Sequence, residues 1–293
     1  MQKGSFVAAL AALSAVLAGC GGIGIADSSS SALVYFGPLG APDIFAAGSS
    51  GGDGVNLTNN GAVDDFPDYN PSTDRVVWET NRDGTYQIYA DTLPSSGSVR
   101  LTVTGSDERY PHFSRDGSKI TFVSTRDGHP EVYIMDANGA NQTRLTNNAE
   151  GNTYPSFSPD GLRITFVSYR VAAPGEVFTM NSDGSNQTQV TNTSNDESFP
   201  SYSTDGATIV FRQSVGAGFR IATIPAAGGV SETGIADLTD ANCYPSVGSD
   251  GRVYFNKLIN TVEEICRCDL SGANFVQLTT TAGDKIAPVF RSK

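Results

Sequence analysis

Polar side chains recur along this chain at one fixed offset, three residues before a series of prolines. The prolines are Pro67, Pro111, Pro155, Pro200, Pro245 and Pro288. The residues three positions earlier are Asp64, Glu108, Asn152, Glu197, Asn242 and Lys285. Gathered in a ring, these groups could bind a cation such as Ca²⁺, or a lysine or arginine of a partner protein. They could equally cap the loop that enters a strand, a usual role of Asp and Asn, and the sequence leaves both interpretations open.

Few other side chains in the sequence could bind a metal or act in catalysis. The two histidines, His112 and His129, are not at metal-ligand spacing, and the sequence gathers no third ligand beside them. Apart from the calcium alternative at the ring, we therefore expect no metal and no other cofactor.

Three arginines share another repeated position, at the end of an apolar segment. They are Arg82, Arg126 and Arg170. We expect them to pair with acidic residues of neighbouring turns, such as Asp83 and Asp127. Exposed pairs of this kind contribute little to stability, so the arginines are interpreted as solubilising surface.

These positions recur because the chain is built from repeats. The stretch NTYPSFSPDGLRITFVS at 152–168 returns as ERYPHFSRDGSKITFVS at 108–124 and as ESFPSYSTDGATIVFRQ at 197–213. A pair formed by an apolar residue and Thr begins at Leu57, Leu101, Leu145, Val190, Leu238 and Leu278. The pairs and the prolines advance in steps of 40 to 48 residues. Six copies of about 44 residues therefore make residues 32–293 one repeat domain.

Each copy predicts four short strands. In the 152–191 copy they are YPSFS, RITFVS, EVFTM and QTQVT, with a Pro-Asp-Gly turn between the first two. Four antiparallel strands in 40 to 45 residues are typical of a propeller blade. We expect the Phe, Tyr and Ile residues of the phrase to fill the layers between blades. The predicted fold class is all-β, a six-bladed β-propeller of four-stranded antiparallel blades.

The two ends of the repeat region complement each other. Residues 286–293, IAPVFRSK, form a first strand that stops where the next turn is due. Residues 32–58 contain ALVYF, DIFAAG and GVNLT, which are strands two to four without a first. We predict that the N- and C-terminal strands pair in one blade and close the ring, which leaves no gap with open strand edges.

The repeat unit resembles the PD40 repeat, a WD40-like unit of the TolB family and related six-bladed propellers. The resemblance rests on YPSFSPDGLRITFVS and EVFTMNSDGSNQTQVT and extends over residues 32–293. It implies a protein-binding module whose natural partner is a peptidoglycan-associated lipoprotein of the envelope. TolB carries an additional α/β domain before its propeller, for which this chain has no room, so we do not expect the whole TolB role.

An enzyme acting on polysaccharide or peptide is the competing function. A propeller lyase of the oligogalacturonate type is expected to show a histidine cluster, which this sequence lacks. His112 occupies a strand position held elsewhere by Asp68, Ser156, Ser201 and Ser246, so we expect it near the central channel. We assign no catalytic residue.

Three cysteines lie in or near the fifth repeat. Cys266 and Cys268 stand on its third strand, and Cys243 precedes its first. The first and third strands of a blade are about 9.5 Å apart, beyond the reach of a relaxed disulfide. We therefore expect buried free thiols.

The N-terminal residues are typical of a bacterial lipoprotein precursor. Residues 1–19 contain one early lysine and an apolar run, as in a signal peptide, and end in the lipobox-like Leu-Ala-Gly before Cys20. We predict cleavage before Cys20 and its lipidation, with residues 20–31 as a flexible Gly/Ser-rich tether. Gly21 stands where an inner-membrane retention signal would place Asp, which favours the periplasmic side of the outer membrane.

The charge composition limits the classes of partner that this chain can bind. The formal net charge is −12 at pH 7, and nucleic-acid binding needs a basic footprint that this chain lacks. We expect a monomeric, extracytoplasmic, membrane-anchored propeller that binds an envelope protein.

Overall fold

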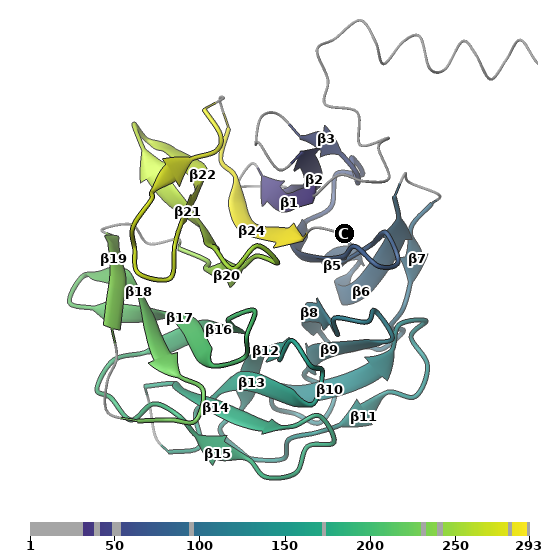
Figure 1. Ribbon diagram of the computed structural model, residues 1–293. Coiled ribbons are helices and arrows are strands. Elements are labelled where there is room, and N and C mark those ends of the chain that lie inside the picture. The colour runs from purple at the N-terminus through teal and green to yellow at the C-terminus, as the bar shows by residue number, and fades with distance from the viewer. Residues whose placement is uncertain are drawn as a thin grey trace, which may run out of the picture.

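The computed structural model describes residues 32–37, 42–48, 54–93, 97–171, 174–229, 233–238, 243–280 and 283–291. The predicted signal peptide, Cys20, the tether and Asn242 lie outside these residues. Within them, 24 strands form six four-stranded antiparallel sheets, arranged as the blades of a ring (Figure 1). The all-β, six-bladed fold is therefore confirmed. No helix in the described part of the chain is long and apolar enough to cross a membrane.

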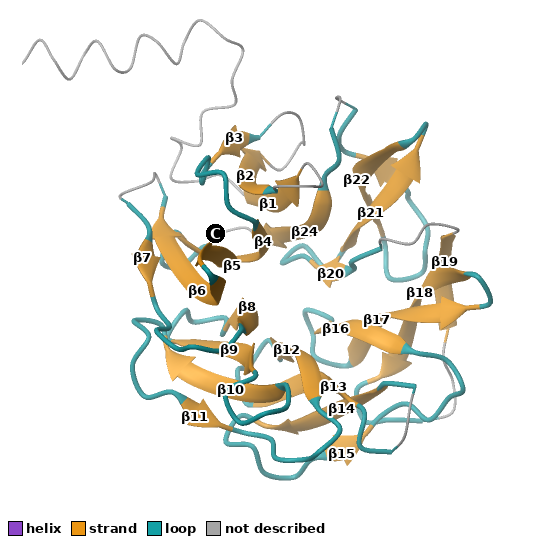
Figure 2. Cartoon of the chain, turned by 180° about the vertical axis from the view of Figure 1, so that it is seen from behind, coloured by secondary structure: helices purple, strands orange, loops and turns teal. Residues whose placement is uncertain are grey.

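The strands repeat the same order in every blade, from the axis outward (Figure 2). The innermost strands are β24 (Ile286–Arg291), β4 (Asp64–Asn70), β8 (Glu108–Phe113), β12 (Asn152–Phe157), β16 (Glu197–Tyr202) and β20 (Ser246–Val247). The second strands are β1 (Ala32–Gly37), β5 (Arg75–Asp83), β9 (Lys119–Ser124), β13 (Arg163–Ser168), β17 (Thr208–Val215) and β21 (Val253–Ile259). The third strands are β2 (Asp43–Gly48), β6 (Thr85–Thr92), β10 (Glu131–Asp136), β14 (Glu176–Asn181), β18 (Gly218–Pro225) and β22 (Val262–Cys268). The outer strands are β3 (Val55–Asn56), β7 (Val99–Arg100), β11 (Thr143–Arg144), β15 (Thr188–Gln189), β19 (Thr233–Leu238) and β23 (Val276–Gln277).

We name the blades A to F after their inner strands β24, β4, β8, β12, β16 and β20. Blade A joins the two ends of the described chain, because β24 pairs antiparallel with β1. Leu33 lies opposite Phe290, and Val34 lies opposite Val289. The predicted closure is confirmed, and it gives every blade a neighbour on both sides.

The hydrophobic core consists of layers between neighbouring blades. The aromatic residue of each second strand lies in such a layer, and none is more than 5% exposed: Phe36, Trp78, Phe122, Phe166, Phe211 and Phe255. Phe122 of blade C, for example, shares a cluster with Val77 and Ile88 of blade B. Burying one such side chain contributes roughly 1.5–3 kcal/mol, so the layers hold the blades at fixed positions around the axis.

The turn between the first and second strands has one repeated geometry in blades C, D and E. In blade D, Ser158 Oγ donates to Asp160 Oδ1 at 2.6 Å, and the Gly161 N–H donates to the Ser158 carbonyl at 2.9 Å. Gly161 has a φ of +71°, a backbone region in which a residue without a Cβ is not strained. These turns surround one end of the central channel.

Candidate functional site

Five of the six inner strands, those of blades A to E, bend at the residue before the proline. Pairing with the second strand shifts register there, for example between Arg109 and His112 and between Thr153 and Ser156. The bend residue adopts a left-handed φ of +46° to +54° at Phe66, Tyr110, Tyr154, Phe199 and Ala287. A β-bulge re-aims the side chain it carries. Left-handed backbone is costly for aromatic residues, and it persists only where the surrounding structure holds it.

Four of these bulges, together with Tyr244 ahead of β20 in blade F, gather five aromatic rings across the axis. We call Phe66, Tyr110, Tyr154, Phe199 and Tyr244 the aromatic plug. The ring centroids of Tyr154 and Phe199 lie 4.0 Å apart, those of Phe66 and Tyr110 4.8 Å, and those of Phe66 and Phe199 5.9 Å. The plug side chains are half-buried. The prediction that every aromatic of the repeated phrase fills an inter-blade layer is therefore wrong for this position, because the bulge directs its side chain to the channel.

Two arginines lie beside the plug. The Arg212 guanidinium stacks near Phe219 at 4.4 Å and Phe199 at 4.9 Å, and its Nε donates to Ser198 Oγ at 2.8 Å. Among the described residues Arg212 forms no ion pair. The Arg109 guanidinium lies 4.0 Å from the Tyr86 ring.

A buried pair of carboxyl groups supports Arg109. Arg109 Nε donates to Glu79 Oε1 at 2.7 Å, and the backbone N–H of the bulge residue Tyr110 donates to Glu79 Oε2 at 2.6 Å. Burial raises the pKa of Asp65 to about 6, against its hydrogen bond with Glu79. Burial and the Asp65 carboxylate also raise the pKa of Glu79 well above its usual value. One arginine and two carboxyl groups thus hold the bulge of blade C.

The predicted ring residues are buried beside the plug and not displayed at the mouth. Asp64, Glu108, Asn152 and Glu197 are 0% exposed, and Lys285 is 5% exposed. Asn242 lies outside the described residues. With no exposed surface, the four groups bond to side chains of the entering loop and of neighbouring strands, as Glu108 does with Thr104 and Ser124.

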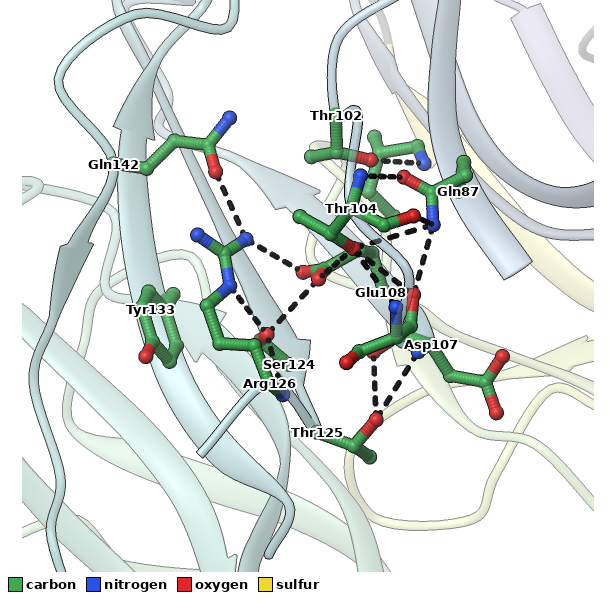
Figure 3. A network of polar contacts seen from close by, with 12 residues as sticks. Gln87, Thr102, Thr104, Asp107, Glu108, Ser124, Thr125, Arg126, Tyr133 and Gln142 are labelled. Carbon is green, nitrogen blue, oxygen red and sulfur yellow. Dashed lines mark hydrogen bonds and ion pairs between the residues drawn. The ribbon is translucent and has the colours of Figure 1, made fainter. Parts of the chain in front are cut away.

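Glu108 shows how such a residue is satisfied (Figure 3). Its Oε1 accepts hydrogen bonds from Thr104 Oγ1 at 2.7 Å and Ser124 Oγ at 3.0 Å, and its Oε2 accepts one from Arg126 Nη2 at 3.0 Å. Burial raises the pKa of Glu108 against these three bonds. Oxygens bonded in this way are not poised for a cation. No cluster of three or more His, Cys, Asp or Glu residues suited to a metal occurs in the part of the chain that the structure describes.

The repeated arginines are partners of the ring. Arg82 pairs with Asp64 at 2.9 Å, Arg126 with Glu108, and Arg170 Nη2 donates to Asn152 Oδ1 at 3.1 Å. The prediction that they pair with Asp83 and Asp127 is wrong. Those two aspartates instead pair with Arg100 at 3.0 Å and Arg144 at 3.2 Å, residues of the outer strands.

Beyond the plug, the channel carries a second set of polar groups. We call Asp68, His112, Ser156, Ser201 and Arg291 the lumen site. All five line a cavity of about 210 Å³ that also touches the turns between first and second strands. His112 thus lies in the channel, as its strand position predicts. Burial and the nearby Arg291 lower the pKa of His112, against the opposing effect of Asp68, so its imidazole is neutral at pH 7.

The cysteines are free and buried, as predicted, at Cys243, Cys266 and Cys268. Burial raises the pKa of Cys266 to about 12 and that of Cys268 to about 11. Reactive cysteines need a thiolate, and the raised pKa keeps Cys266 and Cys268 as neutral thiols that pack in the core. His129 lies in the exposed turn after β9, away from the channel.

Several residues of the candidate site were not predicted from the sequence. The aromatic before each proline was visible as FP or YP, yet strand alternation alone gave no reason to place it in the channel. Arg212 interrupts the apolar pattern of IVFRQ at 209–213, which is the signal that could have identified it. Arg291 ends the last strand, and only ring closure brings it to the axis.

Comparisons with known proteins agree with this architecture. The profile of the PD40 family, described as the TolB beta propeller domain, matches residues 108–292. TolB from Acinetobacter baumannii superposes with a TM-score of 0.79 at 18% identity, covering 92% of this chain and 68% of that one. A putative TolB from Agrobacterium tumefaciens gives a TM-score of 0.59 at 20% identity, covering 72% and 89%. Oligogalacturonate lyase from Vibrio parahaemolyticus gives 0.58 at 11% identity, covering 84% and 74%. No curated protein sequence matches this chain.

Proposed function

This chain belongs to the PD40 family of TolB β-propeller domains, and we propose that it is a binding module of the bacterial cell envelope that recognises another protein. The proposed location is extracytoplasmic, with a lipid anchor on Cys20 that holds the propeller at the periplasmic side of the outer membrane. The proposed partner is an envelope protein, with a peptidoglycan-associated lipoprotein as the first candidate. The anchor rests on the N-terminal sequence, and the partner rests on family resemblance.

The observation that carries the proposal is the composition of the aromatic plug and of the residues beside it. Tyrosine and arginine are enriched among the residues that dominate protein–protein affinity, where half-buried rings gain contact area at little entropic cost. Here the plug rings lie next to Arg212, which lacks a carboxylate partner among the described residues. On the outer side of the plug a groove of about 310 Å³ runs between blades C and D, lined by Arg109, Tyr110, Tyr154 and Tyr169.

The competing enzyme interpretation has less support. His112 Nε2 lies 3.3 Å from Ser156 Oγ, which is the spacing of a nucleophile and its base. However, Arg291 Nη2, which can only donate, lies 3.4 Å from the same Nε2. Burial and this guanidinium lower the pKa of His112, so the imidazole is a weak base for a serine proton. A lyase or peptidase would need another base, and the sequence offers no histidine cluster.

The test is capture of partners from native envelopes after cross-linking, with the captured protein then purified and its affinity measured directly. The decisive variant is Arg212→Gln, and Arg252→Gln is the matched control, because Arg252 carries the same charge on the exposed surface. We expect Arg212→Gln to weaken the purified complex about tenfold or more, as hot-spot truncations do, and Arg252→Gln to leave it unchanged. Melting temperatures check that both variants are folded.

Two results would contradict the proposal. If Arg212→Gln binds as the parent does while Glu108→Gln does not, the ring and not the plug carries recognition. If the parent captures nothing and turns over polyuronate or peptide substrates, with loss of turnover in His112→Ala, the chain is an enzyme.

A further inference from the structure

The lumen site breaks the symmetry of the repeat. At the first position after the proline, blades D, E and F carry Ser156, Ser201 and Ser246, whereas blades B and C carry Asp68 and His112. A serine is enough to line the channel in three blades. The repeated architecture therefore gives no reason for charged groups at this level.

A further polar group reaches the same place from blade A. Arg291 is the last residue of β24, and its guanidinium extends across the axis toward blades B and C. Arg291 Nη1 donates to the Val247 carbonyl at 2.7 Å. Its Nη2 lies 3.4 Å from His112 Nε2 and 3.7 Å from Asp68 Oδ1. Both contacts are longer than an ordinary hydrogen bond of about 2.7–3.2 Å, so Nη2 retains hydrogen-bonding capacity.

Asp68 is also incompletely satisfied. It is 2% exposed, and its Oδ2 accepts a hydrogen bond from the Phe113 N–H at 2.8 Å. Its Oδ1 is buried and accepts no hydrogen bond from the described residues. The Arg291 contact at 3.7 Å is longer than a hydrogen bond. A buried carboxylate oxygen without a donor costs stability, and a ligand donor would remove that cost.

The space is suited to a small molecule. The cavity of about 210 Å³ exceeds an engineered cavity of about 150 Å³ that holds benzene. A second cavity of about 110 Å³ continues from it to the underside of the aromatic plug and shares His112, Ser156, Ser201 and Arg291. Together the cavities have room for roughly six to ten non-hydrogen atoms. The turns at the far end, including Ser72 and Thr204, form the rim through which a ligand would enter.

The charges select the ligand class. Asp68 would repel a simple anion, and Arg291 would repel a simple cation, at a depth where screening by water is weak. We propose that the lumen site binds a small zwitterion, an α-amino acid whose ammonium group donates to Asp68 Oδ1 and whose carboxylate accepts from Arg291. Ser156 and Ser201 supply hydroxyls along the wall. This proposal is independent of the protein-binding function, because the site lies on the other side of the plug.

Isothermal titration of the purified protein tests the proposal with a panel of small probes. Glycine, L-alanine and L-serine carry both charges, propionate only the carboxylate, ethylamine only the ammonium, and glycerol neither. We expect a saturable 1:1 complex with at least one amino acid, at a Kd of about 1 mM or lower. Each half-molecule should bind at least about tenfold more weakly, because it loses one charge-assisted hydrogen bond and leaves Asp68 or Arg291 without its ligand partner.

Two lumen variants assign the contacts. Asp68→Asn keeps an oxygen for the Phe113 N–H and removes the charge, and Arg291→Met removes the guanidinium. Asp136→Asn is the matched control, since it removes the same charge from an exposed pair with Lys119. We expect both lumen variants to lose amino-acid binding by about tenfold or more and the control to keep it. Should Arg291→Met fail to fold, Asp68→Asn decides alone. Equal binding of propionate or glycerol, amino-acid binding that survives in Asp68→Asn, or no binding of any probe would overturn the proposal.

Discussion

Phe166 and Tyr154 belong to the same blade and the same repeated phrase, yet they occupy opposite environments. Phe166 of β13 is 0% exposed and packs in the layer between blades C and D, with Val132 of the neighbouring blade. Tyr154 of β12 is half-buried, has a φ of +52°, and contacts plug rings of the two neighbouring blades at the axis.

The two regions are constrained differently. A layer residue touches one neighbour blade in a fixed geometry, so every blade needs a similar side chain at that position. A channel residue shares one volume with residues of all the other blades. The total space filled is therefore constrained, and not the side chain of each blade. This explains why Phe recurs with little change in the layers. The channel position after the proline, in contrast, varies among Asp, His and Ser.

Breaking the ring should have the largest effect. Deleting residues 284–293 removes β24 and leaves β1 as an open edge, so every layer loses its closed arrangement. We expect the shortened chain to lose cooperative unfolding, measured by thermal melting followed by circular dichroism. An unchanged melting temperature would contradict closure as the origin of stability. Deleting residues 1–19, the predicted signal peptide, is the control and should leave the transition intact.

Replacing an aromatic residue by alanine should lower the free energy of unfolding more in a layer than in the channel wall. Phe166→Ala leaves a cavity between two blades and should lower the free energy of unfolding by about 3–5 kcal/mol. Tyr154→Ala removes a half-buried ring and should cost clearly less, because water can fill the space and part of the surface is already exposed. Urea unfolding of the two variants measures both values. Equal losses would show that the plug is as much a part of the core as the layers are.

The junction between blades C and D differs from the junction between blades D and E in one buried side chain. In blade D, Asn152 Nδ2 donates to Glu131 Oε2 of blade C at 2.7 Å. At the equivalent place in blade E stands Glu197, where Thr191 Oγ1 lies 2.6 Å from Glu176 Oε2 and 3.3 Å from Glu197 Oε2. One junction joins an amide to a carboxylate, and the other joins two carboxyl groups.

The second junction should make stability depend on pH. Burial raises the pKa of Glu197 to about 8, and Glu176 adds to the rise against hydrogen bonds from Gln213 and Thr193. Because the folded pKa lies above the unfolded value of 4.5, the contribution is complete below about pH 4.5 and is lost as the pH rises through about 8. The slope is at most about 1.4 kcal/mol per pH unit.

Glu197→Gln should remove this dependence, because the amide can donate to Glu176 at every pH. Urea unfolding between pH 5 and pH 8 should therefore show a flatter profile for Glu197→Gln than for the parent, with a gain in stability at pH 8. Glu150→Gln, which removes an exposed carboxylate, is the matched control and should retain the parent slope. A parent profile that rises with pH over this range would refute the assignment.

The layers could be predicted from the sequence, whereas in the channel only the placement of His112 could, for a physical reason. Strand alternation identifies Phe122 and Phe166 as facing a core, and a period near 44 residues counts the blades. The same alternation would place Asp64, Phe66 and Asp68 on one face. The bulge inserts an extra residue, so Phe66 turns to the channel while Asp64 is buried against Trp78 and Arg82. Residues before proline usually adopt extended backbone, so the local sequence does not predict the left-handed φ.

The left-handed φ of Tyr154 predicts the smallest change in stability. Its sign should differ between Tyr154 and Phe166. Glycine adopts positive φ without strain, whereas alanine does not, so Tyr154→Gly should be more stable than Tyr154→Ala by about 1 kcal/mol. In the regular strand β13 the order should reverse, because glycine loses more backbone entropy on folding, and Phe166→Gly should be the less stable of its pair by about 0.5–1 kcal/mol. Each comparison holds the lost ring constant, so the difference isolates the backbone. If glycine is the less stable residue at both positions, the bulge does not hold Tyr154 in a left-handed conformation in solution, and the plug must form from ordinary strand geometry.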